Sequence, residues 1–426
     1  MLVMFKANNY MSFKDDVILD LRKANYREHM NHVFSINNEI ELLKTVAIYG
    51  ANASGKSNLI SALSSYRNII IGQLFNEELI EEENDNNIKV NNKKIRSFLL
   101  HESSNEIIEF EMIFSYRDTL FQYGYSIEKN IIKTEWLYIN NKEIYDRKGN
   151  EIKIKSGTKY EKILKNYTKL REDRLYIALL DYFVTEEVLK EKINIFTEYI
   201  KEKLNIYFEI IIESTIKGVA GMVSISDKLV ENDAFRIKVS QYISKIDVGI
   251  KEIIVDEEVV TNRRTGDKRK EATIKCVHNV YDTNGIIIGE KAFELYDESS
   301  GTIRFISFIQ NILELIEEGG VFVVDELSSR LHPLLTKFIV DIFQSEINKK
   351  NAQLIFTTHD LSLLNSEQFR RDEIVLMDKN EQGVSNIYSL ADLGVRKDAS
   401  YSKDYLKGKY GAIPIIKESI SKRDNK

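Results

Sequence analysis

The chain has 426 residues, and its 60 Lys and Arg residues against 66 Asp and Glu residues give a formal net charge of −6. A chain of this length is expected to form two or three domains, or one large composite domain, with a substantial core. Its single cysteine excludes an internal disulfide framework, and its mild acidity excludes a wholly basic nucleic-acid-binding protein but not a local basic patch.

The first third of the chain predicts a buried strand, a helix and antiparallel strands. An apolar run over residues 39–49 leads into Gly50, as expected for a buried strand before a glycine turn. Residues 57–68 carry apolar side chains at helical spacing. Residues 109–114 and 121–127 alternate apolar and polar side chains, a pattern that is typical of antiparallel strands.

The middle of the chain predicts helices followed by a hairpin. Residues 160–206 show helical spacing with dense charge and without glycine or proline, and residues 234–246 predict a further helix. Strand character returns at residues 251–260 and 272–280. Residues 261–270 between these strands form a basic, turn-forming tip.

The last third of the chain alternates helix and strand. Helical spacing covers residues 301–317 and 334–348, and short apolar runs at residues 321–324 and 353–357 predict strands. Such alternation favours a parallel sheet with helices on its faces.

The first chemical motif lies between the predicted strand and helix near the N-terminus. Residues 50–57 fit the pattern G-x-x-x-x-G-K-[ST] at every fixed position. The glycines let backbone N–H groups surround phosphate oxygens, Lys56 would reach the β- and γ-phosphates, and the Ser57 hydroxyl would bind Mg²⁺. A chance glycine-rich turn is the alternative, which the flanking strand and helix disfavour. The candidate ATP-binding residues are Gly50, Ala51, Asn52, Ala53, Ser54, Gly55, Lys56, Ser57 and Asn58.

A second motif places two carboxylates after the apolar run 321–324. Open α/β sheets bind ligands at the carboxyl ends of their strands, and Asp325 and Glu326 stand at such an end. Asp325 is suited to bind Mg²⁺ together with Ser57, and Glu326 is suited to orient or deprotonate an attacking water. An ordinary acidic turn is the alternative, which the presence of a phosphate loop disfavours.

A third motif places a histidine after the apolar run 353–357. A neighbouring parallel strand would bring His359 beside the γ-phosphate, where it can sense or stabilise that group. A structural histidine is the alternative. The predicted catalytic residues are therefore Lys56, Glu326 and His359.

A fourth motif, Ser299-Ser300-Gly301, opens the predicted helix 301–317. Hydroxyls and backbone N–H groups at a helix N-terminus form a second anion site, although a local N-cap is the alternative. One phosphate loop needs no second anion site in its own subunit. The two sites make sense together if one nucleotide is shared between two subunits.

These four segments, in this order, resemble the ATP-binding cassette ATPases, and specifically the head domains of SMC and double-strand-break-repair proteins. The resemblance implies an α/β P-loop NTPase with a parallel core sheet and an antiparallel β subdomain. It also implies that ATP and Mg²⁺ bind between the phosphate loop of one protomer and the signature motif of another, in a dimer or higher homo-oligomer. Ser299, Ser300 and Gly301 match the signature Ser-Gly-Gly, with Ser300 in place of the first glycine. Residues 327–332 resemble the D-loop.

The long coiled coil of SMC proteins is missing, and a compact helical insertion takes its place. This departure resembles the stand-alone bacterial AAA-family ATPases that include the RloA, AbiL and OLD-type phage-defence proteins. We expect an N-terminal ATPase lobe at residues 1–156, a helical insertion at residues 157–248 and a C-terminal ATPase lobe at residues 249–426. The region expected to hold the Q-loop, residues 96–101, contains no glutamine, and Gln122 lies inside a predicted strand.

The resemblance implies an ATP-hydrolysing switch that closes as a dimer and controls an effector in anti-phage defence. Only about 50 residues follow Asp378, too few for the nuclease domain of OLD-type proteins, so we expect a nuclease or toxin effector to be a separate chain. The alternative is a DNA-binding ATPase of repair or chromosome maintenance, which the basic tip at residues 261–270 supports unless that tip is merely a solvated hairpin. A transporter subunit is disfavoured because the insertion and the chain's opening segment resemble SMC heads.

Two absences bear on localisation. No stretch approaches the ~18 uninterrupted apolar residues of a transmembrane helix. Residues 1–14 contain no apolar core like that of a signal peptide. We therefore expect a cytoplasmic protein that makes no contact with a membrane.

Overall fold

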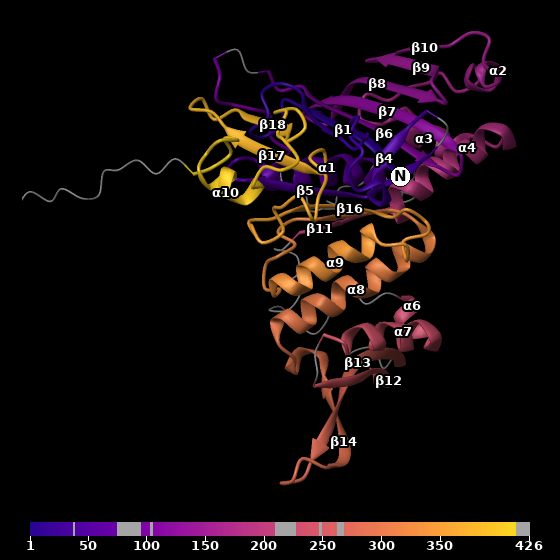
Figure 1. Ribbon diagram of the computed structural model, residues 1–426. Helices are drawn as coiled ribbons and strands as arrows, with labels where there is room; N and C mark the ends of the chain where they lie inside the picture. The colour runs from indigo at the N-terminus through magenta and orange to yellow at the C-terminus, as the bar shows by residue number, and fades with distance from the viewer. Residues whose placement is uncertain are drawn as a thin grey trace, which may run out of the picture. The chain divides into compact units, whose positions relative to one another are not determined.

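The computed structural model describes residues 1–36, 39–74, 95–102, 105–208, 227–246, 249–261 and 268–414. The chain forms two compact units that interleave along the sequence (Figure 1). The units are Met1–Ile206, Gly320–Asp325 and Gln353–Lys426 for the first, and Tyr207–Gly319 and Glu326–Ala352 for the second. The domain boundaries near residues 157 and 249 stay a prediction. In the part of the chain described, no helix is both long and apolar enough to cross a membrane.

An antiparallel sheet of seven strands, in the order β10-β9-β8-β7-β6-β1-β2, forms one layer of the first unit. Its strands are β1 (Leu2–Asn8), β2 (Val17–Asp20), β6 (Ile108–Tyr116), β7 (Thr119–Glu128), β8 (Ile131–Ile139), β9 (Lys142–Lys148) and β10 (Glu151–Ile154). Along most of β6 every second side chain is buried, because successive side chains point to opposite faces of a sheet. The antiparallel strands predicted at residues 109–114 and 121–127 are confirmed.

A second sheet of the first unit has the order β11-β15-β16-β5-β17-β18. Its strands are β11 (Leu204–Tyr207), β15 (Val321–Val324), β16 (Gln353–Thr357), β5 (Thr45–Gly50), β17 (Ile374–Lys379) and β18 (Ser385–Ser389). Strands β15, β16, β5 and β17 pair in parallel, which confirms the predicted parallel core. The apolar run 39–49 divides in two, because β4 (Glu41–Leu43) pairs with β3 (Val33–Ser35) before β5 begins.

Helix α1 (Lys56–Leu74) follows β5 and contacts both β5 and β1. Its Tyr66 packs edge-on against Phe5 of β1, with ring centroids 5.9 Å apart, and stacks on Tyr125 of β7 at 5.7 Å. These contacts fix the helix that begins at the end of the phosphate loop. Among the described residues, the other helical segments of the first unit are a 3₁₀ turn (Met30–His32), α2 (Glu161–Leu164), α3 (Tyr176–Phe183), α4 (Glu187–Glu198), a π-helical turn (Tyr199–Lys203) and α10 (Tyr401–Leu406).

The second unit contains helices and a three-stranded antiparallel sheet with the order β12-β13-β14. Its elements in the described part of the chain are α6 (Asp227–Glu231), α7 (Asp233–Ile243), β12 (Ile250–Thr261), β13 (Lys268–Tyr281), β14 (Ile287–Glu294), a 3₁₀ turn (Leu295–Asp297), α8 (Ser300–Glu318) and α9 (Pro333–Gln344). The helix predicted at 334–348 is too long. It ends at Gln344 because the Asn348 side chain bonds the backbone of Phe343 and Ala352 at 2.7–2.8 Å. Of the basic tip 261–270, residues 262–267 lie outside the described residues.

Candidate functional site

The loop between β5 and α1 has a backbone that only small residues allow. Gly55 has φ 113°, and a Cβ built on it would lie 2.5 Å from Ser385 Oγ and 3.2 Å from Ser12 Oγ. A Cβ built on Gly50 would overlap the Met377 carbonyl oxygen. Side chains at either glycine would therefore push the loop away from β17 and β18. Without these Cβ atoms, the loop can adopt the tight conformation in which backbone N–H groups face a phosphate.

Lys56 lies at the first turn of α1, and its side chain is buried. Its Nζ donates to the carbonyl oxygens of Gly50 at 3.0 Å and Ala51 at 3.1 Å. The same Nζ lies 3.1 Å from His359 Nε2. The structure therefore brings the predicted phosphate lysine and the predicted sensor histidine into direct contact.

His359 follows the carboxyl end of β16. Burial lowers the pKa of its imidazole below the ordinary value, and the neighbouring Lys56 ammonium lowers the pKa further, against an opposing effect of Asp325. The lowered pKa favours the neutral ring, whose Nε2 lone pair can accept the hydrogen bond from Lys56. The contact is thus consistent with an uncharged histidine.

Asp325 follows the carboxyl end of β15, the strand next to β16. Its Oδ1 accepts a hydrogen bond of 2.7 Å from the hydroxyl of Thr357, which is fully buried. Because β15 and β16 are parallel neighbours, Asp325 and His359 emerge at the same edge of the sheet. The Thr357 hydroxyl fixes the orientation of the predicted metal-binding carboxylate.

The residues of the loop fit a phosphate and a divalent cation. The two glycines form a cradle that a Cβ would fill. Ser54 Oγ is buried and has no hydrogen-bond partner among the described residues, which leaves it available to a ligand. Ser57 is exposed at the start of α1. The side-chain amide of Asn58 donates to Ser12 Oγ at 2.7 Å, and a role of Asn58 in ATP binding stays a prediction.

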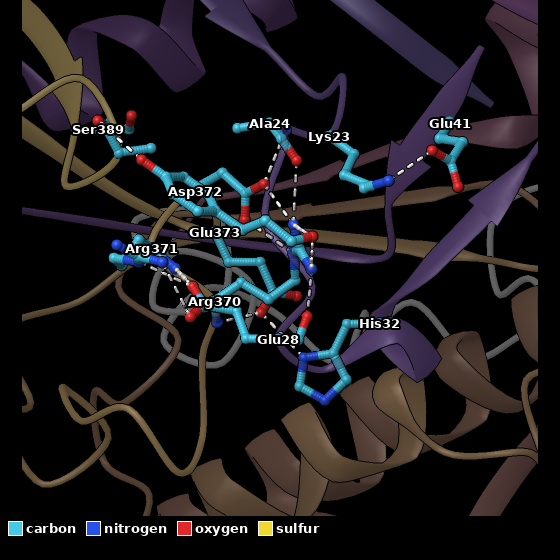
Figure 2. A network of polar contacts seen from close by, with 12 residues as sticks. Lys23, Ala24, Glu28, His32, Glu41, Arg370, Arg371, Asp372, Glu373 and Ser389 are labelled. Carbon is cyan, nitrogen blue, oxygen red and sulfur yellow. Dashed lines mark hydrogen bonds and ion pairs between the residues drawn. The ribbon is translucent and has the colours of Figure 1, made fainter. Parts of the chain in front are cut away.

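A buried polar network, which sequence reasoning missed, fixes the start of β5 (Figure 2). Glu373 is fully buried; its carboxylate accepts a hydrogen bond from the Thr45 hydroxyl and lies 2.9 Å from His32 Nδ1. Arg370 N donates to the same carboxylate at 2.8 Å, and Ala47 N donates to the Glu373 carbonyl oxygen at 2.8 Å. Since β5 ends at the phosphate loop, this network determines where the loop begins.

In the second unit, Glu326 begins the segment that follows β15. Its φ is 55°, a left-handed conformation that costs about 1–3 kcal/mol for a residue other than glycine. Its carbonyl oxygen accepts a 2.6 Å hydrogen bond from the guanidinium of Arg304, a buried residue of α8. The signature helix therefore holds the backbone of the predicted base.

The predicted signature residues lie at the N-terminus of α8. Ser299 is the N-cap, and its Oγ accepts from Thr302 N at 3.1 Å. Ser299 and Ser300 are exposed, so that a second molecule can approach their hydroxyls. A Cβ built on Gly301 would lie 2.8 Å from the Arg330 carbonyl oxygen, which explains why the residue beside the D-loop is glycine. The local capping role is confirmed, and a role toward a second subunit stays a prediction.

The structure thus brings Lys56, His359 and Asp325 together in one unit, and Glu326 and the signature residues in the other. Gln122 lies inside β7, where its amide donates to Glu111 at 2.7 Å. The sequence prediction that Gln122 is a strand residue is confirmed.

A phosphate loop between a buried parallel strand and a helix, with acidic and histidine residues at the ends of adjacent parallel strands, defines a P-loop NTPase. A family profile described as "AAA domain, putative AbiEii toxin, Type IV TA system" matches residues 46–365, about three quarters of the chain. The chain belongs to this AAA family of P-loop proteins.

Other comparisons add structural likenesses but no curated relative. No curated protein matches the sequence. Among solved structures, an SMC head bound to the C-terminal winged-helix domain of ScpA has 14% identity and a TM-score of 0.42, over 91% of this chain and 97% of that one. The SMC head of Thermotoga maritima has 13% identity and a TM-score of 0.41, over 91% and 98%. An SMC head bound to ScpA derived from Pyrococcus furiosus has 13% identity and a TM-score of 0.40, over 91% and 96%.

Proposed function

We propose that this chain is an ATP-hydrolysing switch. The observation that carries the proposal is the contact between Lys56 of the phosphate loop and His359 at the end of a parallel strand, with Asp325 beside them. Lys56 would bind the β- and γ-phosphates, and the backbone N–H groups of the loop would surround them. His359 would sense the γ-phosphate. A phosphate that attracts the Lys56 ammonium would break the contact between Lys56 Nζ and His359 Nε2.

Asp325 and Ser57 would hold Mg²⁺, which neutralises charge on the phosphate oxygens when it is bound. Glu326 would accept a proton from the attacking water. We further propose that a second copy closes over the nucleotide with Ser299 and Gly301, because their site is exposed and one loop needs no further anion site of its own. ATP, Mg²⁺ and a second copy are thus the expected partners of this site.

The experiment compares two variants of the full chain. Glu326→Gln is expected to bind ATP and to accumulate as an ATP-dependent dimer, which light scattering after size-exclusion chromatography detects. Lys56→Ala is expected to lose ATP binding. If Glu326→Gln hydrolyses ATP at the wild-type rate, Glu326 is not the base.

We propose that the closed and open forms control a separate effector, such as a nuclease or toxin, in cytoplasmic anti-phage defence. The description of the family, which names an AbiEii toxin and a toxin–antitoxin system, supports this role. Cells that carry the natural gene locus are expected to survive phage challenge better than cells with Lys56→Ala. Equal survival would contradict the defence role without bearing on ATP hydrolysis. The DNA-repair alternative predicts salt-dependent DNA binding through residues 261–270.

A further inference from the structure

The D-loop and the signature motif form one small surface in the second unit. The Arg330 carbonyl oxygen lies so close to Gly301 that no Cβ would fit between them. Arg330 itself has φ 59°, a left-handed conformation that is uncommon for residues other than glycine, asparagine and aspartate. Such a conformation persists where the surroundings determine it. The backbone therefore fixes where the Arg330 side chain begins, next to the signature.

A pocket of about 200 Å³ lies at this surface. Ser299, Thr302, Arg330 and His332 contribute its polar lining, and Phe305 belongs to its apolar lining. Arg330 is exposed. Arg330, an exposed cationic residue, thus lines the same pocket as the predicted signature serine, Ser299.

We propose that Arg330 binds the phosphates of the ATP held by a second copy of this chain, and so acts as a catalytic arginine supplied in trans. This inference rests on the proposed function. A planar guanidinium donates two parallel hydrogen bonds to phosphate oxygens, whereas the Ser299 and Ser300 hydroxyls each donate one. A guanidinium supplied at this place would stabilise negative charge on the transferring phosphoryl group.

The test uses the Glu326→Gln chain, which is expected to trap the ATP-bound dimer. Arg330→Asn removes the charge but keeps a residue that tolerates φ 59°, so that the D-loop fold is preserved. We expect Arg330→Asn to release labelled ATP from the trapped dimer at least about tenfold faster. With Glu326 intact, we expect it to lower the hydrolysis rate about 100-fold. At protein concentrations too low for dimerisation, the affinity of the Arg330→Asn monomer for ATP is expected to equal that of the parent chain. Lys350→Asn, which removes an exposed charge of the same unit, is the control and should change neither rate.

Three outcomes would overturn the inference. If Arg330→Asn releases ATP at the rate of the Lys350→Asn control, Arg330 does not bind the nucleotide. If it weakens ATP binding equally below the dimerisation concentration, Arg330 acts in its own subunit. If Glu326→Gln itself forms no ATP-dependent dimer, the proposed function fails first and the inference fails with it.

Discussion

The hydrogen bond between Thr357 and Asp325 makes a quantitative prediction for Mg²⁺ binding. Thr357→Val keeps the shape of the side chain but removes the hydroxyl that donates to the Asp325 carboxylate at 2.7 Å. A hydrogen bond to a charged group contributes about 1.5–3 kcal/mol. The hydrogen bond also forms without the metal, so at 1.4 kcal/mol for each tenfold change roughly 10–100-fold weaker Mg²⁺ binding is the upper range, reached if the carboxylate loses its metal-binding orientation. Residues that orient metal ligands have effects of about the same size.

The assay is a Mg²⁺ titration of ATP hydrolysis at saturating ATP. Thr357→Val is expected to raise the half-saturating Mg²⁺ concentration by up to that factor, whereas the maximal rate at high Mg²⁺ recovers. Thr357→Ser keeps a hydroxyl and is the matched control, for which a near-normal titration is expected. If Thr357→Val and the wild type share one half-saturating concentration, Asp325 is not a metal ligand oriented by Thr357.

Further predictions concern the loop, the histidine and a buried ion pair. Gly55→Ala is expected to abolish ATP binding, because residue 55 has φ 113° and the new Cβ would overlap the Ser385 hydroxyl. The control is Gly72→Ala, whose Cβ would meet no other atom and which should leave ATP binding intact. A titration with fluorescent ATP measures both. The pKa of His359 is lowered in the chain without ATP, and a bound phosphate would favour the charged imidazole. ATP affinity should therefore increase as the pH falls from about 6.5. Calorimetric titrations of His359→Gln should lack this increase in affinity. Arg147→Met leaves the fully buried Glu135 carboxylate without its ion-pair partner and should destabilise the first unit by about 3–5 kcal/mol in urea unfolding, a loss that Arg147→Lys should reduce.

Local patterns predict the strands at the candidate phosphate site well because these strands are short, apolar and sharply bounded. The strands at 321–324 and 353–357 have the predicted bounds, since each apolar run is fully buried and ends at polar residues. Helix α1 continues to Leu74, beyond the predicted end at residue 68, because Ile70 on its inner face is also buried. The side chains that meet at the site follow directly from these elements.

Long-range polar contacts have no such local signal. Glu373 lies directly before β17 and reaches His32, more than three hundred residues away in the chain. Likewise, Glu135 accepts hydrogen bonds from the backbone N–H groups of Tyr176 and Ile177 at the start of α3. A charged residue in a strand pattern predicts an exposed position, so only tertiary structure shows that these carboxylates are buried and paired.

The boundary between the two units falls within the acidic pair itself, since one unit ends a segment at Asp325 and the other begins one at Glu326. Two consecutive Cα atoms are about 3.8 Å apart across a trans peptide bond. Covalent geometry therefore fixes the distance between the backbones of the predicted metal ligand, Asp325, and the predicted base, Glu326. The direction in which Glu326 points is set by its left-handed backbone and by Arg304. A substitution at Arg304 is therefore expected to act on Glu326 through its backbone and to leave the hydrogen bond between Thr357 and Asp325 in place.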